Sequence, residues 1–363
     1  MNDNQSSIRQ PSEGTVEQLS FGTTSIIHHN LADLPPASSE VGFLWNNCIA
    51  ASMSTCFLTK WAKEATDPDI KEGLQMELEA AATAWQDTKT LFESIDYPVP
   101  AGFGEQDIDI QAPALFSQSF HLLFTRMMQR MLIQHLVPAV TSAYRQDFQD
   151  FFHGQIKTAA DRHRQYTEIL LAKGVLQRHP TIVRPQQAEI VHDKDFLGSY
   201  FSVFGKQRSL TAVEIGHIYS IMEIEQLIRT FLKGYSQVVQ SDKVRKYLLK
   251  AGDAMAEQLD ALGGILTDED LSGPSISEAL ITDSTTPEMS DRLVLSLATA
   301  VTAFIATSYG EAISTMARKD LGVTMMRFIT EILSLAKDGA ELSIELGWLE
   351  KSPQTAERKE LSH

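Results

Sequence analysis

The sequence is poor in cysteine: Cys48 and Cys56 are its only two among 363 residues. On a single helix, which rises about 1.5 Å per residue, they would lie about 12 Å apart along the axis, too far for a disulfide bond. Reduced, buried cysteines are typical of a reducing compartment, so we expect a cytoplasmic protein. The N-terminal sequence MNDNQSSIRQPSEG has no apolar core that could serve as a signal peptide.

Basic residues are scarce relative to acidic ones, with 31 Lys and Arg against 47 Asp and Glu and a net charge of -16 at pH 7. Such a chain repels phosphate backbones and anionic lipids, so no nucleic-acid partner is expected. Two uncharged stretches, 41–59 and 293–310, could be read as membrane spans. Both carry several Asn, Ser or Thr side chains, which lipid-facing helices rarely do, so we expect two buried helices and no membrane span.

Catalytic signatures are lacking as well. The sequence has no Gly-x-x-x-x-Gly-Lys phosphate loop, no Gly-x-Ser-x-Gly elbow and no paired Cys-x-x-Cys. An alternating strand pattern is almost absent, so a dinucleotide-binding fingerprint would have no strand to follow. We therefore predict no catalytic residue and no cofactor, and the sequence does not disclose a specific activity.

What the sequence does contain is an internal repeat: residues from about 40 to 178 align with residues from about 214 to 351. The offset is 174 at first (216 minus 42) and 173 after a one-residue slip (318 minus 145). Matched pairs are Gly42 with Gly216, Phe57 with Phe231, Leu74 with Leu248, Arg145 with Arg318, Asp147 with Asp320 and Gly174 with Gly347. Each repeat has the size of a domain and should fold around its own core, the two being related by a pseudo-twofold or similar operation.

Hydrophobic periodicity predicts an all-α protein. The expected helices span about 39–64, 68–95, 113–143, 148–173, 212–239, 242–267, 288–317 and 320–346. Four helices per repeat, with short first and third connections and a second one long enough to run the length of a bundle, favour two tandem up-down four-helix bundles. We expect a flexible N-terminal arm over 1–37, the first bundle over 38–178, a linker over 179–210, the second bundle over 211–350 and a C-terminal tail over 351–363.

Several residues are expected to mark helix ends. Asp67 before Pro68, and Ser241 in the second repeat, have the chemistry of N-caps. The repeated Arg-x-Asp element, at Arg145 and Arg318, is expected to place its Asp as the N-cap of the following helix. The seventh helix is apolar or small on every side, so we expect it to be covered all round where the bundles meet, with the uncharged first helix.

Four segments resemble a known family: EVGFLWNNCIAASMS, DYPVPAGFGEQDIDIQAPALFS, FLGSYFSVFGKQRSLTAVEIGHIY, and ARKDLGVTMMRF with GWLEKSPQTAERKEL. They look like the uncharacterised bacterial family called domain of unknown function 3231. The resemblance covers nearly everything after the N-terminal arm. It implies tandem ferritin-like four-helix bundles, in spore-forming bacteria, that are sometimes likened to spore-coat proteins. It implies no activity, because none is established for the family.

A ferritin-like fold raises the question of a di-metal site, which needs a Glu on each of two helices and a Glu-x-x-His on each of the other two. Of the two Glu-x-x-His matches, Glu189 with His192 lies in the linker, without a helix. Glu214 with His217 begins a helix, but Thr211 makes Glu214 part of a capping box. The remaining equivalent positions are Glu40 and Phe43, Glu77 and Ala80, and Ala251 and Ala254. No metal site is predicted.

Other polar and adaptable side chains have structural readings. Glu331, Asp338 and Glu345, seven residues apart, are expected on a solvated helix face. His28 and His29 lie in the arm, and packing or surface roles are expected for His121, His135, His153 and His163. Met127, Met128 and Met131, near the helix-bending Pro138, are expected in the core, with a ligand channel or partner groove as the alternative.

Three functional hypotheses follow from these patterns. The leading one is a non-enzymatic helical scaffold or protein-interaction protein, with a protein partner or a second copy of itself. The first alternative is a ferritin-like metal-binding protein or di-metal oxidase, which the fold favours. The second is a carrier of an apolar small molecule inside one bundle.

Overall fold

The computed structural model describes residues 34–200, 207–276, 280–356 and 358. Most of the predicted arm over 1–37, with His28 and His29, lies outside these residues. Residues 36–363 form one compact unit, which carries all the described helices. These are α1 (Ser38–Glu64), α2 (Pro68–Ser94), α3 (Gln118–Thr141), α4 (Gln146–Ala172), α5 (Ala212–Val238), α6 (Asp242–Thr267), α7 (Asp291–Thr315) and α8 (Lys319–Glu345), with short 3-10 turns η2 (Glu105–Asp107) and η3 (Lys194–Leu197).

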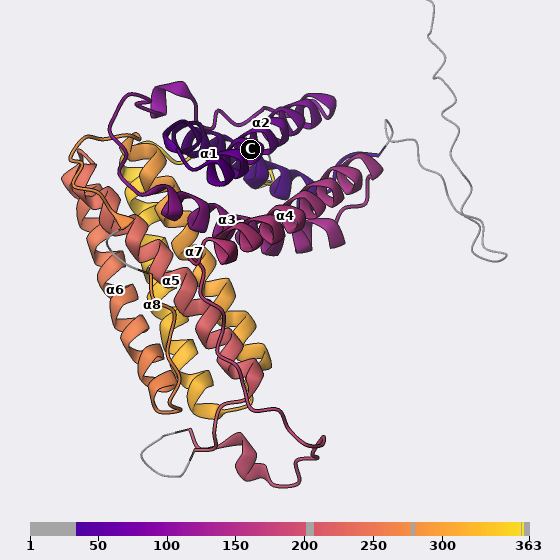
Figure 1. The fold of residues 1–363 in the computed structure, drawn as a ribbon. Helices are drawn as coiled ribbons and strands as arrows, with labels where there is room; N and C mark the ends of the chain where they lie inside the picture. Colours follow the sequence, from indigo (N-terminus) through magenta and orange to yellow (C-terminus); the bar gives the residue numbers. More distant parts are fainter. Residues whose placement is uncertain (1–33, 201–206, 277–279, 357, 359–363) are drawn as a thin grey trace, which may run out of the picture. The chain divides into compact units, whose positions relative to one another are not determined.

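The helices form two bundles, α1–α4 and α5–α8 (Figure 1). In each, the first helix packs mainly on the second and the third mainly on the fourth. The described residues contain no β-strand, only two isolated β-bridges. The prediction of an all-α protein with a duplicated four-helix bundle is confirmed.

Each long connection returns along the length of its bundle. The Gln118 side chain, at the start of α3, accepts hydrogen bonds from the backbone N–H groups of Thr66 and Asp67, both at 2.9 Å. Asp291, at the start of α7, does the same for Gln240 and Ser241, at 3.1 and 2.6 Å. The third helix therefore begins where the second one begins, and the connection has crossed the bundle as expected.

The connections also pair with one another across the two repeats. Four backbone hydrogen bonds join them: Asp109 N–H to Glu288 O (2.9 Å), Thr282 N–H to Leu115 O (2.9 Å), Ser117 N–H to Leu280 O (2.8 Å) and Ser290 N–H to Asp107 O (2.8 Å). The four bonds form two equivalent pairs. Adding 173 to the residue number from the first repeat, and subtracting 173 from the one from the second, converts each bond into its equivalent (282 minus 109, 288 minus 115). Such reciprocity defines an isologous contact, so a pseudo-twofold axis relates the repeats, as predicted.

An aromatic core lies at this axis. The equivalent residues Phe57 and Phe231 face each other with ring centroids 6.0 Å apart. Phe116, Trp61 and Tyr235 continue the cluster on either side. One hydrophobic cluster thus runs through both repeats, and a smaller one fills part of the first bundle. The expectation of a separate core in each repeat is corrected, because the larger cluster contains buried residues of both bundles, among them the aromatic side chains packed at the axis.

The helix covered on all sides is α5 and not α7. No residue of α5 from Ile221 to Leu232 is exposed, whereas α7 exposes Ala303, Thr307 and Gly310. Small uncharged side chains on α7 therefore face solvent, while α1, the equivalent of α5, is largely buried as expected. By length and composition α1 and α7 could each cross a membrane, and 61% of the apolar window of each is buried inside the protein.

Helix starts show one further correction. Asp67 accepts hydrogen bonds from the N–H groups of Asp69 and Ile70, and Ser241 from that of Val244, so both N-caps are confirmed. Asp147 and Asp320 are not N-caps: Arg145 and Arg318 hold that position. Each Asp instead pairs with the guanidinium group of its Arg, at 2.8 and 2.7 Å. The carboxylates that accept hydrogen bonds from the N–H groups of Arg145 and Arg318 are those of Glu40 and Glu214, on the first helix of each bundle.

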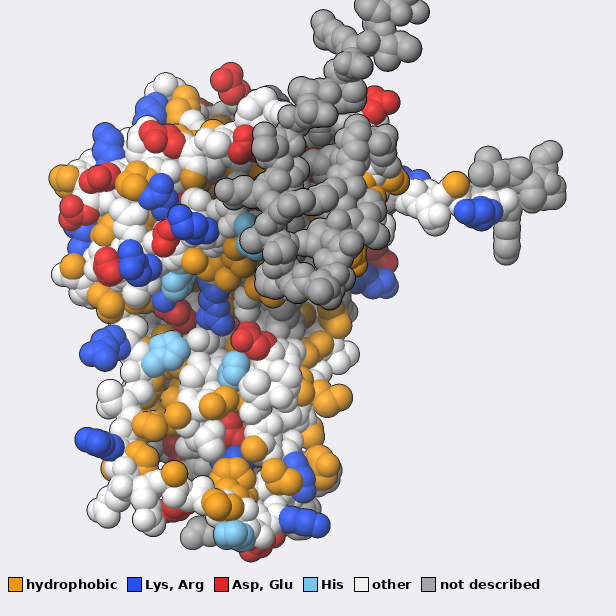
Figure 2. Space-filling model, turned by 90° about the vertical axis from the view of Figure 1, so that its right-hand side faces the viewer, with side chains coloured by type: hydrophobic (Ala, Val, Ile, Leu, Met, Phe, Trp, Pro, Cys, Tyr) orange, Lys and Arg blue, Asp and Glu red, His pale blue; other side chains and the backbone are white. Residues whose placement is uncertain are grey.

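On the face shown in Figure 2, Lys and Arg side chains are interspersed with Asp and Glu side chains and are not separated by sign. The described residues seen on this face form no continuous basic stripe of the kind that follows a nucleic-acid backbone.

Candidate functional site

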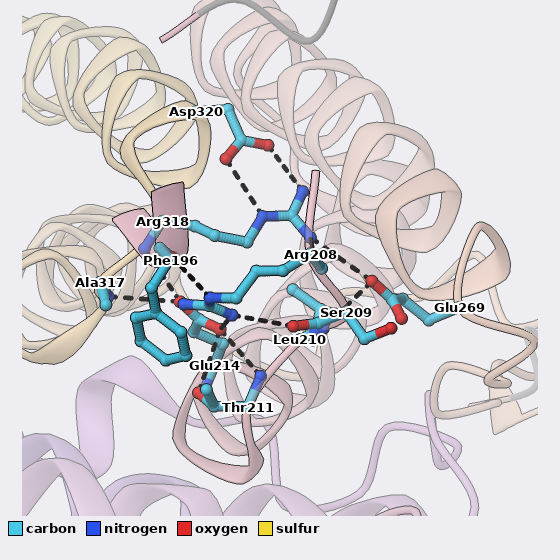
Figure 3. A network of polar contacts seen from close by, with 10 residues as sticks. All are labelled: Phe196, Arg208, Ser209, Leu210, Thr211, Glu214, Glu269, Ala317, Arg318 and Asp320. Carbon is cyan, nitrogen blue, oxygen red and sulfur yellow. Dashed lines mark hydrogen bonds and ion pairs between the residues drawn. The ribbon is translucent and has the colours of Figure 1, made fainter. Parts of the chain in front are cut away.

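Glu214, at the start of α5, is the centre of a dense polar network (Figure 3). Its fully buried carboxylate accepts hydrogen bonds from the backbone N–H groups of Thr211 (2.8 Å) and Arg318 (3.0 Å), and from the guanidinium group of Arg208 (2.7 and 2.9 Å). Burial acts to raise the pKa of Glu214, but Arg208 and these N–H groups outweigh it and lower the pKa to about 2. The predicted capping box with Thr211 is confirmed.

The first repeat has an equivalent buried glutamate that accepts hydrogen bonds from backbone N–H groups. The Glu40 carboxylate accepts hydrogen bonds from the N–H groups of Ala37 (2.6 Å), Tyr144 (2.7 Å) and Arg145 (2.7 Å). In both repeats a buried glutamate thus joins the start of the first helix to the start of the fourth. The partner of His217 is Thr315, whose Oγ1 lies 2.8 Å from the imidazole Nε2. Glu214 therefore has a structural role, and His217 does not share it.

The other predicted carboxylates do not converge either. Glu189 and His192 are exposed, in a part of the linker that is not helical. On α8, Glu331 accepts a hydrogen bond from Gln258 at 2.9 Å, Asp338 pairs with Lys250 at 2.7 Å, and Glu345 pairs with Lys243. The three acids therefore join α8 to α6 along the edge of the bundle.

Each bundle holds a buried glutamate that is hydrogen-bonded to a tyrosine. In the first, Glu77 accepts hydrogen bonds from Tyr166 Oη and Gln129 Nε2, both at 2.8 Å. In the second, Glu225 accepts one from Tyr309 Oη at 2.7 Å. The two glutamates do not occupy equivalent positions, because the repeat equivalents of Glu77 and Glu225 are Ala251 and Ala51. Glu225 and Tyr309 were not predicted as a site, and Glu225 is recognisable only as an acid in the apolar run IMEIEQLI.

Burial is the main cause that raises the pKa of Glu225, to about 8; Glu331 adds to it and the Tyr309 hydroxyl opposes it. Because the unfolded carboxyl has a pKa near 4.5, the stability linked to this group is present below that pH and is lost as the pH rises through about 8. Glu225→Gln cannot ionise. Between pH 5 and 8.5 we expect the wild type to lose at least about 1.4 kcal/mol more than this variant, the value of one pKa unit. Denaturant unfolding at both pH values measures the difference, and parallel pH profiles would contradict it.

Tyr166 in the first bundle and Tyr247 in the second fill equivalent spaces, but they extend from helices that are not equivalent, α4 and α6. Tyr166 on α4 lies over Gly73 on α2, and its hydroxyl donates to the Gly73 carbonyl oxygen at 3.1 Å. In the second repeat the equivalent of Gly73 is Tyr247 and the equivalent of Tyr166 is Gly339. A Cβ atom on Gly339 would lie 2.7 Å from Tyr247 Oη. The glycine and the tyrosine have exchanged helices between the repeats.

A buried polar cluster lies at the junction of the bundles. Lys60 is 1% exposed, lies 2.7 Å from Glu64 and donates to the Ala112 carbonyl oxygen. His121 stacks on Trp61 with centroids 4.9 Å apart, and burial, together with Lys60, lowers its pKa to about 3. Glu288 accepts a hydrogen bond from Tyr235 at 2.7 Å, and burial foremost raises the pKa of Glu288 to about 7. The cluster thus places its lysine against the Glu64 carboxyl group, beside an imidazole that is neutral at pH 7 and a second acid whose pKa is raised by burial.

The remaining predicted residues have packing or surface roles. His135 packs edge-on against Phe43, His153 is exposed, and burial together with Arg126 and Arg130 lowers the pKa of His163 to about 4. The Met127, Met128 and Met131 side chains pack in or against the shared hydrophobic core, as predicted. Met128 also borders a cavity of about 30 Å³ between Phe57 and Gln129. That volume suits a water molecule and not an apolar cargo.

A larger hollow opens between α2 and α4 of the first bundle. It has a volume of about 450 Å³ and is lined by Met76, Glu79, Ala80, Thr83, Asp87, Asp150, Phe151, Gly154, Gln155, Thr158 and Arg162. We call it the α2–α4 groove. The repeat equivalents of Gly154 and Gln155 are Arg327 and Phe328, and Phe328 is buried against the core. The groove therefore marks a place where the first repeat lacks an aromatic side chain that the second repeat has.

No group of three or more His, Cys, Asp or Glu side chains that could hold a metal ion occurs within the described ranges. Cys48 and Cys56 are buried free thiols, and burial is the main cause that raises the pKa of Cys56 to about 12. The polar features of the structure are thus the capping carboxylates, the buried Glu–Tyr pairs and the junction cluster, which lie at separate places. The α2–α4 groove is an open hollow apart from them.

Comparison with known proteins places the chain in a family. No curated protein matches it. Among solved structures it is similar to a candidate spore coat protein from Bacillus halodurans C-125, with 13% identity and a TM-score of 0.39, over 41% of this chain and 98% of that one. The model of a family described as "Protein of unknown function (DUF3231)" matches twice, over residues 28–188 and residues 199–361. Together with the repeated bundles, these two matches show that the chain belongs to the DUF3231 family.

Proposed function

We propose that this protein is a non-enzymatic helical scaffold that binds other proteins. The observation that carries the proposal is the state of the two bundle interiors. Glu77 and Glu225, two buried acids of these interiors, are each hydrogen-bonded to a tyrosine of the same bundle. They do not occupy equivalent positions in the two repeats, because alanine stands at the position equivalent to each. Such interiors stabilise the fold by packing and do not have the composition of a di-metal centre, because that centre requires several carboxylates and imidazoles that converge in one bundle.

The junction supports the same function. Reciprocal backbone hydrogen bonds and a shared aromatic core hold the two bundles against each other. A scaffold needs such a fixed arrangement, because partners bound to different bundles are then held at a constant spacing. The buried free thiols of Cys48 and Cys56 support a cytoplasmic location.

Metal analysis tests this proposal against the di-metal alternative. We expect well below one iron, manganese or zinc per chain after aerobic reconstitution and desalting, because Glu77 and Glu225 each accept a hydrogen bond from a tyrosine and the described residues contain no group of three or more His, Cys, Asp or Glu side chains that could hold a metal ion. Elemental analysis of the wild type and of the double variant Glu77→Gln with Glu225→Gln measures the metal content per chain. About two metals per chain, lost in the double variant, would overturn the scaffold and establish a metal protein.

Native mass spectrometry of the same samples tests the carrier alternative. We expect the mass of the bare chain, since the interior cavity beside Phe57 has room for about one water molecule. A retained small molecule that leaves on denaturation would favour the carrier instead.

A further inference from the structure

We propose that the α2–α4 groove binds a partner segment that presents an aromatic side chain next to an arginine. This inference rests on the proposed scaffold function and names the surface and the kind of partner. The groove lies in the first bundle, and the equivalent residues of the second repeat indicate what fits there.

The second bundle shows the shape of the occupant. At the position equivalent to Gln155, the Phe328 side chain is 1% exposed and packs on Tyr309, with ring centroids 5.6 Å apart. Arg327, at the position of Gly154, lies over the Phe328 ring at 4.7 Å from its centroid. In the second repeat, the chain's own aromatic side chain and arginine therefore occupy the corresponding place. In the first repeat the same place is a groove of about 450 Å³, within the range of sites that hold small ligands or side-chain anchors.

The charge of the groove favours a basic occupant. Its rim carries Glu79, Asp87 and Asp150, all exposed, against one cation, Arg162. The Arg162 guanidinium group donates to Gln165 Oε1 at 3.1 Å, and no lysine or arginine among the described residues forms an ion pair with the three acids. Three carboxylates and one guanidinium leave two negative charges (three minus one), which an arginine on the partner would complement.

The floor of the groove suits an aromatic ring. Phe151 offers an aromatic surface, and the Met76 thioether, whose sulfur accepts hydrogen bonds from Arg162 at 3.7 Å and from Gln165 at 3.8 Å, offers a polarizable one. Gly154 has no side chain, and a Cβ atom there would meet no atom within 4 Å. A partner can therefore approach the backbone of α4 closely at this point.

The test uses the full-length protein and the probe N-acetyl-Phe-Arg-amide, with the Met76 methyl group followed by NMR. We expect a saturable shift of this signal with the Phe-Arg probe, and a much smaller one with N-acetyl-Phe-Glu-amide at the same concentration. Gly154→Arg with Gln155→Phe rebuilds the second-repeat surface and should abolish the shift. Because a side chain at position 154 meets open space, this variant should fold, and its thermal unfolding midpoint checks that it does.

A second pair of variants keeps the test decisive if the filled variant fails to fold. Asp87→Asn with Asp150→Asn removes two rim charges and should weaken binding about twofold to thirtyfold, since two exposed charge pairs at about 0.2–1 kcal/mol each contribute about 0.4–2 kcal/mol. Asp253→Asn with Asp260→Asn, on the exposed face of α6, is the matched control and should leave binding unchanged. No saturable shift, equal binding of the two probes, or full binding by the filled variant would overturn the groove proposal. None of these outcomes alters the metal content, which tests the scaffold separately.

Discussion

Tyr166→Gly is expected to lower the free energy of unfolding by about 4–6 kcal/mol, the sum of a lost large aromatic side chain and a glycine inside a helix. The Tyr166 ring is fully buried, and its hydroxyl group donates to the Gly73 carbonyl oxygen and to Glu77. The substitution would leave a cavity between α2 and α4 and remove one of the two hydrogen bonds that Glu77 accepts. Guanidinium-induced unfolding followed by circular dichroism measures the loss.

The repeat supplies the control for this variant, because the second bundle fills the equivalent space from the other helix. A Cβ atom at Gly73 would lie 3.3 Å from Tyr166 Cε1 and 3.5 Å from Leu122 Cδ1, so removal of Tyr166 frees most of the space. Gly73→Tyr should be harmful alone, yet in combination with Tyr166→Gly it should recover at least about 2 kcal/mol, a typical coupling between residues in contact. Additive losses in the double-mutant cycle would show that the two repeats are not packed equivalently.

Gly234→Ala is expected to destabilise the protein by about 3 kcal/mol, the upper part of the usual range for overpacking. A Cβ atom at Gly234 would lie 2.5 Å from Phe116 Cε1 and also collide with Cζ. The Phe116 ring has little freedom to move, because it stacks on Phe120 at 4.2 Å and contacts Tyr235 at 5.4 Å. Thermal unfolding of the variant tests the close approach of α5 to the first repeat.

Gly216→Ala, on the same helix, is the matched control for Gly234→Ala. A Cβ atom there would meet nothing within 4 Å, so this variant should gain up to about 1 kcal/mol from its higher helix propensity. Phe116→Met should relieve Gly234→Ala, since methionine is the residue that the other repeat places at this position, Met289. Equal effects of the two alanine substitutions would show that Phe116 does not lie against Gly234.

The helices could be predicted from the sequence because their apolar periodicity is local, and their ends fall close to the expected ones. The starts of α3 and α7 were placed too early, at 113 and 288 rather than Gln118 and Asp291. In the structure the preceding residues, among them Leu115 and Glu288, form the backbone bonds between the connections. That pairing joins residues about 170 positions apart, so no local pattern reveals it.

The burial of whole helices was harder to predict. The lack of charged residues on α7 indicated a buried helix, yet some of its small side chains are exposed to solvent. In contrast, α5 is buried although it carries Glu223 and Glu225. Of the polar sites, the Thr211–Glu214 capping box follows a sequence rule and was predicted. The clamp by Arg208 joins residues only six positions apart, but it forms in a segment without helical periodicity that no sequence rule singled out. The exchange of Tyr166 for Tyr247 depends on contacts between helices that are distant in sequence, which spacing along the chain does not encode.

The reciprocal contact between the repeats has a consequence for how the chain can change. Two separate, identical copies that met through this contact would carry every substitution twice, once on each side of the axis. Linkage in one chain holds the partners at a high effective concentration and makes the two sides independent. Phe116 can then enter the space above Gly234, while Met289 and Lys60 take the corresponding positions on the other side. Covalent linkage thus permits an asymmetric interface, with Lys60, Glu64 and His121 contributed by one repeat and Tyr235 and Glu288 by the other.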